Sequence, residues 1–131
     1  MNILKPIDIE EETRLAIKDY VTAYVRPLPK TYTLPNVLIT STGGSTGNTI
    51  DKFTVVIDSR AENDAEAYDT LTTAIGVLEA QAQAQTGALR HVEINSLARW
   101  GSDPARPDLK LCTATALVTV HRESVDVEIN Q

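Results

Sequence analysis

Residues 63–85 read NDAEAYDTLTTAIGVLEAQAQAQ, a segment with the periodicity of one long amphipathic helix. Its larger apolar residues recur at steps of three and four and form one stripe: Tyr68, Leu71, Ile75, Leu78 and Ala82. Asn63 suits the N-cap, because its side chain can accept from the first-turn N–H groups while Glu66 bonds back to it. Gly87 suits the C-terminal exit, where a left-handed backbone is common. The helix would be about 34 Å long. An apolar stripe of that length needs a sheet beneath it to be buried.

The segments before this helix predict a shorter helix and an antiparallel hairpin. Residues Ile9–Val25 carry an apolar face behind acidic residues, and Pro27 and Pro29 close that helix. Two strands are expected at Val37–Thr42 and Lys52–Ser59. The glycine-rich residues between them, Gly43–Thr49, are predicted to form a flexible loop without regular structure.

Two further strands are expected after the helix, at Leu89–Arg99 and Lys110–Arg122, with a Gly/Pro/Asp loop between them. The even positions of the last strand are small and apolar, as expected of a face under a helix: Cys112, Ala114, Ala116, Val118 and Val120. Its odd positions mix leucine with threonine. They are too polar for a core and too apolar for bare solvent, so we expect an assembly to cover this face in part.

The order helix, strand, strand, helix, strand, strand predicts an α+β fold with a four-stranded, mainly antiparallel sheet and two helices on one face. A chain of 131 residues fits a single domain. Its ends, residues 1–8 and 123–131, are expected to be flexible or to become ordered on assembly.

Composition excludes several function classes. The longest apolar runs are only a few residues, so no membrane-spanning segment or signal peptide is predicted. The net charge of −6 argues against general affinity for nucleic acid, because the phosphate backbone favours clustered Lys and Arg. The single cysteine, Cys112, excludes an internal disulfide.

No pattern in the sequence predicts catalysis, a cofactor or a metal site. The GGSTG segment at 43–47 is followed by Asn48 and a strand, so it lacks the helix N-terminus that makes such loops bind phosphate. His91, His121 and Cys112 do not have metal-ligand spacing. We therefore expect a protein that is not an enzyme.

The residues that remain are candidates for contacts within an assembly. Arg99 and Arg106 near Trp100 are compatible with a recognition patch, although an aromatic residue that caps the sheet edge is the favoured interpretation. The candidate assembly contacts are Gly43, Gly44, Ser45, Thr46, Gly47, Asn48, Leu111, Thr113, Leu117, Trp100 and Arg106.

Several segments together resemble tail terminator proteins of siphovirus-type long-tailed bacteriophages, especially those of actinobacterial hosts. These are PNVLITSTGG at 35–44, the strand and alanine-rich helix over 53–84, and LARWGSDPARPDL at 97–109 before a Thr/Val strand that ends at His121-Arg122. The resemblance implies a homohexameric ring at the head-proximal end of the tail, assembled in the host cytoplasm. Its implied partners are other copies of itself, the major tail tube protein and a neck protein, while DNA passes through the lumen without specific binding.

Two other functions are compatible with the same pattern. The nearer one is a neck or head-completion connector, because such rings resemble terminators. The more distant one is a small ligand-binding domain that uses the glycine-rich loop. Oligomeric state separates them, since a ring favours a tail or neck protein and a monomer with a bound small molecule favours the last.

Overall fold

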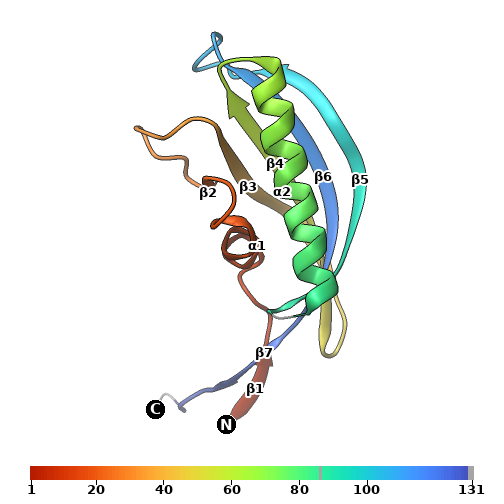
Figure 1. The fold of residues 1–131 in the computed structure, drawn as a ribbon. Coiled ribbons are helices and arrows are strands. Elements are labelled where there is room, and N and C mark those ends of the chain that lie inside the picture. Colours follow the sequence, from red (N-terminus) through yellow and green to blue (C-terminus); the bar gives the residue numbers. More distant parts are fainter. Residues whose placement is uncertain (86, 130–131) are drawn as a thin grey trace.

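The computed structural model describes residues 1–85 and 87–129 (Figure 1). The elements in chain order are β1 (Asn2–Lys5), α1 (Ile9–Ile17), β2 (Ala23–Val25), β3 (Asn36–Thr46), β4 (Ile50–Ala61), α2 (Asp64–Ala84), β5 (Leu89–Ser102), β6 (Lys110–His121) and β7 (Glu123–Asp126). Five strands form one sheet in the order β2-β3-β4-β6-β5. In this sheet β2 pairs with β3 in parallel and the other neighbours are antiparallel. Strands β1 and β7 form a separate antiparallel ribbon.

The predicted four-stranded, mainly antiparallel sheet with the order α-β-β-α-β-β is therefore wrong. The α+β class and the two helices are found, and both helices lie over the same face of the sheet (Figure 1). The sheet is mixed and has a fifth strand, β2, and the two chain ends add a second small sheet. The error has two sources, the N-terminal helix and the ribbon.

Helix α1 ends at Ile17, eight residues before the predicted end at Val25. Residues 23–25 instead pair in parallel with residues 37–39 of β3, and the Val37 N–H donates to the Thr22 carbonyl at 2.9 Å. This segment is rich in β-branched and aromatic residues, which fit a pleated sheet better than a helix interior. Pairing with β3 thus overrides an apolar spacing that was also compatible with a helix.

Helix α2 is close to its prediction. The Asn63 side chain accepts from the Glu66 N–H at 2.9 Å, as expected of the N-cap. The left-handed residue at the C-terminal end is Gln85 (φ 53°), not Gly87. Four stripe residues are buried against the sheet, but Tyr68 is 44% exposed and was wrongly placed in the core. The other buried side chains of α2 are Ala67, Thr70 and Ala74.

The predicted flexible loop at 43–49 is also wrong. Strand β3 continues to Thr46 and β4 begins at Ile50, so a long hairpin projects with only three residues at its tip (Figure 1). Gly43 has φ 127° where the register shifts, a conformation that glycine adopts without strain. The glycines therefore permit a bulged strand here.

Gly44 has a separate packing role that yields a prediction. A Cβ at this position would collide with the backbone carbonyl of Lys52 and lie 2.8 Å from Cδ1 of Phe53. Gly44→Ala should therefore open the outer hairpin and raise amide hydrogen exchange at Lys52–Thr54. The control is Gly101→Ala, where an added Cβ meets nothing within 4 Å. Equal protection of the hairpin amides from hydrogen exchange in both variants would contradict the close approach of Gly44 to Lys52 and Phe53.

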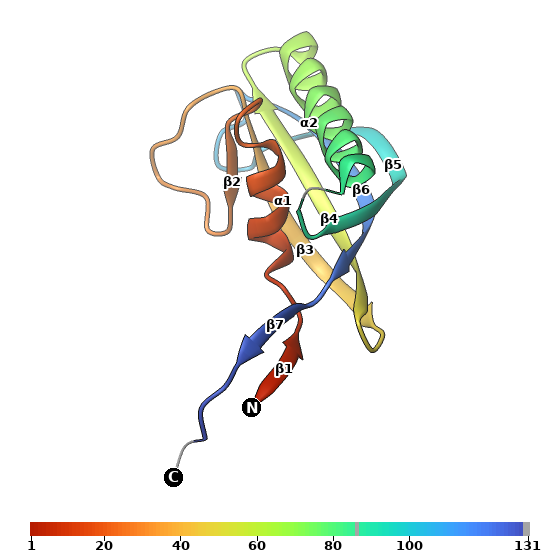
Figure 2. The ribbon, with the colours of Figure 1, turned by 60° about the horizontal axis from the view of Figure 1, so that its bottom comes forward.

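The ribbon of β1 and β7 leaves the body beside α1 and points away from the sheet (Figure 2). The N-terminal amine of Met1 contacts Asp126 Oδ1 at 3.0 Å, which holds the far end of the ribbon together. At its base, burial and the nearby carboxylates of Glu123 and Glu11 raise the pKa of Glu12 on α1. Burial first, and repulsion by these carboxylates second, therefore disfavour the ionised form of Glu12.

The raised pKa of Glu12 predicts a variant whose stability depends on pH. Because the pKa of Glu12 is higher in the folded state than in the unfolded state, ionisation of Glu12 disfavours folding, and this cost disappears at low pH. Glu12→Gln should raise the melting temperature at pH 7, and the gain should vanish below about pH 4, the ordinary range of a glutamate pKa. Thermal unfolding at both pH values measures this, with exposed Glu93→Gln as control. A gain of equal size at both pH values would rule out the electrostatic cause.

Candidate assembly surfaces

The alternation of β6 divides the sheet into a buried face and an open one. Its even positions, Cys112 to Val120, are at most 1% exposed, so the predicted helix-covered face is confirmed. The odd positions are half-exposed, because both helices lie over the opposite face (Figure 1). The members of this open face on β6 are Leu111, Thr113, Thr115, Leu117 and Thr119.

Neighbouring strands extend the open face with similar side chains. Register places Leu117 beside Thr54, Thr115 beside Val56, and Thr113 beside Asp58. Thr113 Oγ1 donates to Asp58 Oδ1 at 2.5 Å, so this carboxylate is bound within the face. The three predicted residues of β6 therefore lie on one broad surface, which carries leucine, valine and threonine together with charged side chains such as Asp58 and Glu93.

The glycine-rich candidates occupy a different place. Residues 42–50 are all exposed and form the end of the β3–β4 hairpin, beyond the C-terminal end of α2 (Figure 1). Ile50 is 42% exposed there. The hairpin thus presents an ordered, projecting end at one end of the sheet.

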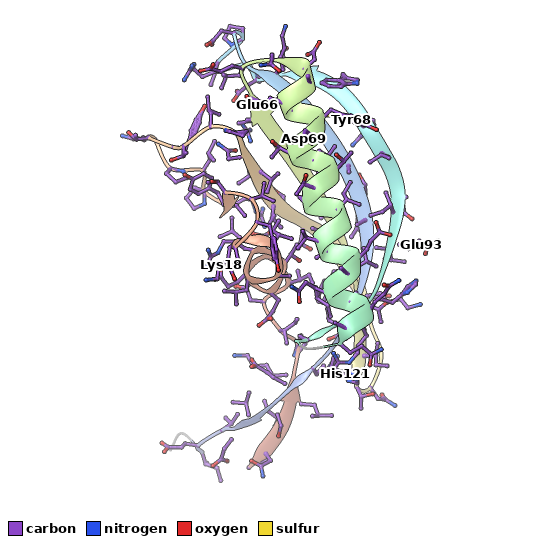
Figure 3. All side chains as sticks on the ribbon, in the orientation of Figure 1. Lys18, Glu66, Tyr68, Asp69, Glu93 and His121 are labelled. Atoms are coloured by element: carbon purple, nitrogen blue, oxygen red, sulfur yellow. The ribbon has the colours of Figure 1, made fainter. Side chains whose placement is uncertain are left out.

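Trp100 lies at the opposite end of the sheet, on the edge strand β5. Its ring stacks on Tyr68 of α2, with centroids 6.4 Å apart and planes at 18°; Figure 3 shows Tyr68 on the side of α2 toward β5. Two register shifts, between Ile94 and Ser96 and between Ser96 and Arg99, precede Trp100, and Ala98 within the second shift has φ 59°. Positive φ is strained for alanine, and such bulges redirect side chains on edge strands. The register places Trp100 opposite Cys112 of the helix-covered face and the preceding Arg99 opposite Thr113 of the open face.

Arg106 belongs to the loop that follows β5 and makes its own contacts. Its guanidinium binds Asp108 at 2.9 Å, and both side chains are exposed. The preceding Asp103 is fixed by the Ala105 N–H and by Arg60, and these hydrogen bonds hold the pKa of Asp103 below its usual range. Arg106 and Trp100 therefore have different partners: Arg106 pairs with Asp108, and Trp100 stacks on Tyr68 at the edge strand.

The possible chemistry of the described residues is limited. No group of three or more His, Cys, Asp or Glu side chains within residues 1–85 and 87–129 is placed to hold a metal ion. Cys112 is fully buried, and burial raises the pKa of its thiol, which disfavours the reactive thiolate. Neither described helix is long and apolar enough to cross a membrane.

Two features of these surfaces were missed by sequence reasoning. The stack of Tyr68 on Trp100 was hidden because Tyr68 fits the helical stripe by spacing. The ribbon was hidden because its two strands are far apart in the sequence. Even the paired residues nearest in sequence, Lys5 and Glu123, have 117 residues between them. An acidic tail with alternating valines, at 123–129, was the available signal.

Comparisons with known proteins add no relative. No protein-family model matches this sequence, and no curated protein shows significant similarity to it. The relationship to tail terminator proteins therefore stays a prediction.

Proposed function

We propose that this protein is a structural subunit of a bacteriophage virion, which forms a ring, expected to be a hexamer, at the head-proximal end of the tail. The ring caps the tail tube, stops addition of tube subunits and presents a surface for the head. The observation that carries the proposal is the open face of the sheet, which neither described helix covers and which carries leucine, valine and threonine beside Asp58 and Glu93.

The size of this face fits an interface between subunits. Four long strands about 4.8 Å apart, each of about 12 residues at about 3.3 Å per residue, give roughly 750 Å². A specific interface buries about 800 Å² on each partner. A single face of this sheet is therefore large enough for a stable contact with a neighbour or with the tube.

The placement of the other candidates suits a ring with two different neighbours. The β3–β4 hairpin projects at one end of the sheet, and the C-terminal end of β5 with the loop that follows it lies toward the other (Figure 1). Trp100 belongs to that end of β5 and Arg106 to that loop. A terminator contacts the tube on one side and the neck on the other, so two separate ends are needed. The net charge of −6 suits a lumen through which DNA passes, because like charges repel phosphate.

Native mass spectrometry and complementation test the proposal. The wild-type protein should have the mass of a hexamer, and a phage that lacks its gene should make overlong tails without heads. Leu117→Asp should shift the protein to monomer without unfolding it, because this half-exposed side chain leaves the acid access to water. The matched control, Glu93→Gln at the cross-strand neighbour of Leu117, should keep the ring.

Tail length also separates the two virion functions. Overlong tails in the absence of the protein support a terminator. Tails of normal length that lack heads would instead indicate a neck protein. Normal tails joined to heads would overturn both.

A further inference from the structure

We propose that the ribbon of β1 and β7 from one copy lays its apolar face in the groove between α1 and α2 of the next copy. The inference deepens the proposed function and rests on it, because it assigns one contact between neighbours in the ring. It is based on two apolar surfaces of one chain that match in length, lack charge along their middles and do not meet within that chain.

The ribbon has one apolar and one polar face. Residues that pair across an antiparallel ribbon share a face, and alternate pairs point to opposite faces. Ile3 is 37% exposed and Val127 is 40% exposed, although a two-stranded ribbon is marginally stable without a packed face. Two pairs form the apolar face: Met1 with Val127, and Ile3 with Val125.

The groove consists of two adjoining hollows between the helices. The larger, of about 400 Å³, is lined by Tyr20 and by residues of α2: Gly76, Val77, Ala80, Gln81 and Ala84. The smaller, of about 170 Å³, lies between Leu15 and Ala16 of α1 and the C-terminal end of α2, and it shares Gln81 with the first. Leu15 is 42% exposed and Tyr20 is 64% exposed, so apolar side chains in the groove contact water in the single copy.

The two surfaces have similar lengths. The groove follows α2 from Gly76 to Ala84, a length of about 12 Å. The ribbon from Met1 to Lys5 is about 14 Å long, and its two strands lie about 4.8 Å apart. One face of the ribbon therefore covers the length of the groove.

Neither surface carries a charge in its middle. Between Gly76 and Ala84 the only charged residue is Glu79, which lines a separate hollow beside β5. On the ribbon, Asp126 lies on the polar face, where the Met1 amine binds it at 3.0 Å. The charged residues at the ends of the two surfaces have both signs: Glu12, Lys18 and Asp19 at the groove, and Lys5 and Glu123 at the base of the ribbon.

Other exposed surfaces fit the ribbon less well. The open face carries Asp58 and Glu93, and an apolar ribbon laid on it would remove these carboxylates from water. The exposed side chains at the end of β5 are divided between the two faces of the sheet, because Arg99 and Trp100 lie on opposite sides. The groove therefore offers the better apolar surface.

One chain does not fill its own groove. The ribbon leaves the body beside α1 and points away from it (Figure 2). Arg122, at the start of the ribbon, is fixed to Asp51 through three hydrogen bonds. A second copy must therefore supply the ribbon. A contact between two different patches of identical chains is head-to-tail, and such contacts form rings when the rotation closes.

The ribbon contact supplements the open face. Two strands of about 14 Å, each about 4.8 Å wide, cover roughly 130 Å². A specific interface needs about 800 Å² on each partner, so the ribbon alone would not hold two copies together. Loss of this contact should therefore weaken the ring without abolishing it.

Disulfide trapping tests the contact directly. A chain with both Ile3→Cys and Ala80→Cys should form a ladder of disulfide-linked copies under oxidation, and the native Cys112 is buried and does not compete. The control chain carries Ile3→Cys and Leu97→Cys, whose second cysteine is exposed on β5. An equal ladder in the control, or linked copies from Ile3→Cys alone, would overturn the proposal.

Polar substitutions give an independent readout. Ile3→Asn and Ala80→Gln should each raise the protein concentration at which half of the copies are in rings by about tenfold. The double variant should be no weaker than either single variant, because the same contact is lost. The matched controls are Leu4→Asn on the polar face of the ribbon and Ala65→Gln at the exposed N-terminal end of α2, and both should keep the ring.

The outcomes separate this contact from the proposed function. Rings of wild-type stability in both Ile3→Asn and Ala80→Gln would overturn the ribbon contact while the proposed function stands. Specific trapping in a protein whose loss leaves tails of normal length joined to heads would overturn the function and support the contact.

Discussion

Replacement of Leu71 by alanine should lower the free energy of unfolding by about 2–5 kcal/mol, the range for a buried leucine that leaves a cavity. Leu71 is fully buried in the middle of the α2 face that packs on the sheet. Loss of the side chain removes contacts with both layers, and the long helix above cannot collapse into the space. Urea denaturation followed by circular dichroism measures the change.

The matched control is Leu97→Ala, the same substitution at a side chain that is 51% exposed on β5. It should change stability by no more than about 0.5 kcal/mol, as is usual for surface positions. A loss of that small size for Leu71→Ala would mean that the stripe of α2 faces water. The layered arrangement of helices on sheet would then be incorrect.

Features determined by local chemistry could be predicted from the sequence. The alternation along β6 requires only that small apolar residues face the helices, so its two faces were assigned correctly. The cap at Asn63 depends on residues three positions apart, and it is present. The hairpin between β3 and β4 also follows from two adjacent alternating segments.

Features determined by distant partners could not be predicted. The segment Ala23–Val25 is helical or extended depending on whether β3 lies beside it, and pairing with β3 decides. Tyr68 fits the apolar stripe by spacing, but its ring stacks on Trp100 at the edge. Gly43 and Gly44 resemble loop residues, whereas one forms a bulge and the other permits close strand approach. The predicted contact residues consequently lie on separate surfaces of the protein and do not form one site.

The largest effect among the polar side chains is expected at Arg122. Its guanidinium binds the Asp51 carboxylate through three contacts of 3.1 to 3.2 Å. The Asp51 side chain is 0% exposed and that of Arg122 is 18% exposed. A buried carboxylate without its partner loses both water and counter-charge. Arg122→Ala should therefore destabilise the fold by about 3–5 kcal/mol.

Two controls separate burial from charge. Arg106→Ala removes the exposed pair with Asp108 and should lower stability far less than Arg122→Ala, because water screens an exposed ion pair. The double variant Asp51→Asn, Arg122→Met should be more stable than Arg122→Ala alone, because it leaves no unpaired charge in the core. Urea denaturation of the three variants compares them. Equal losses for Arg122→Ala and Arg106→Ala would show that Asp51 is hydrated when Arg122 is absent.

The position of this ion pair links stability to the proposed assembly. Arg122 lies between the last residue of β6 and the first of β7, and its N–H donates to the Thr49 carbonyl at the hairpin at 3.1 Å. The residue therefore fixes both the ribbon and the hairpin to the sheet. Hydrogen exchange in Arg122→Ala should rise first at Ser124–Asp126 and Ile50–Lys52, before the β5–β6 core exchanges. Uniform exchange across the sheet would instead indicate that Arg122 supports only global stability.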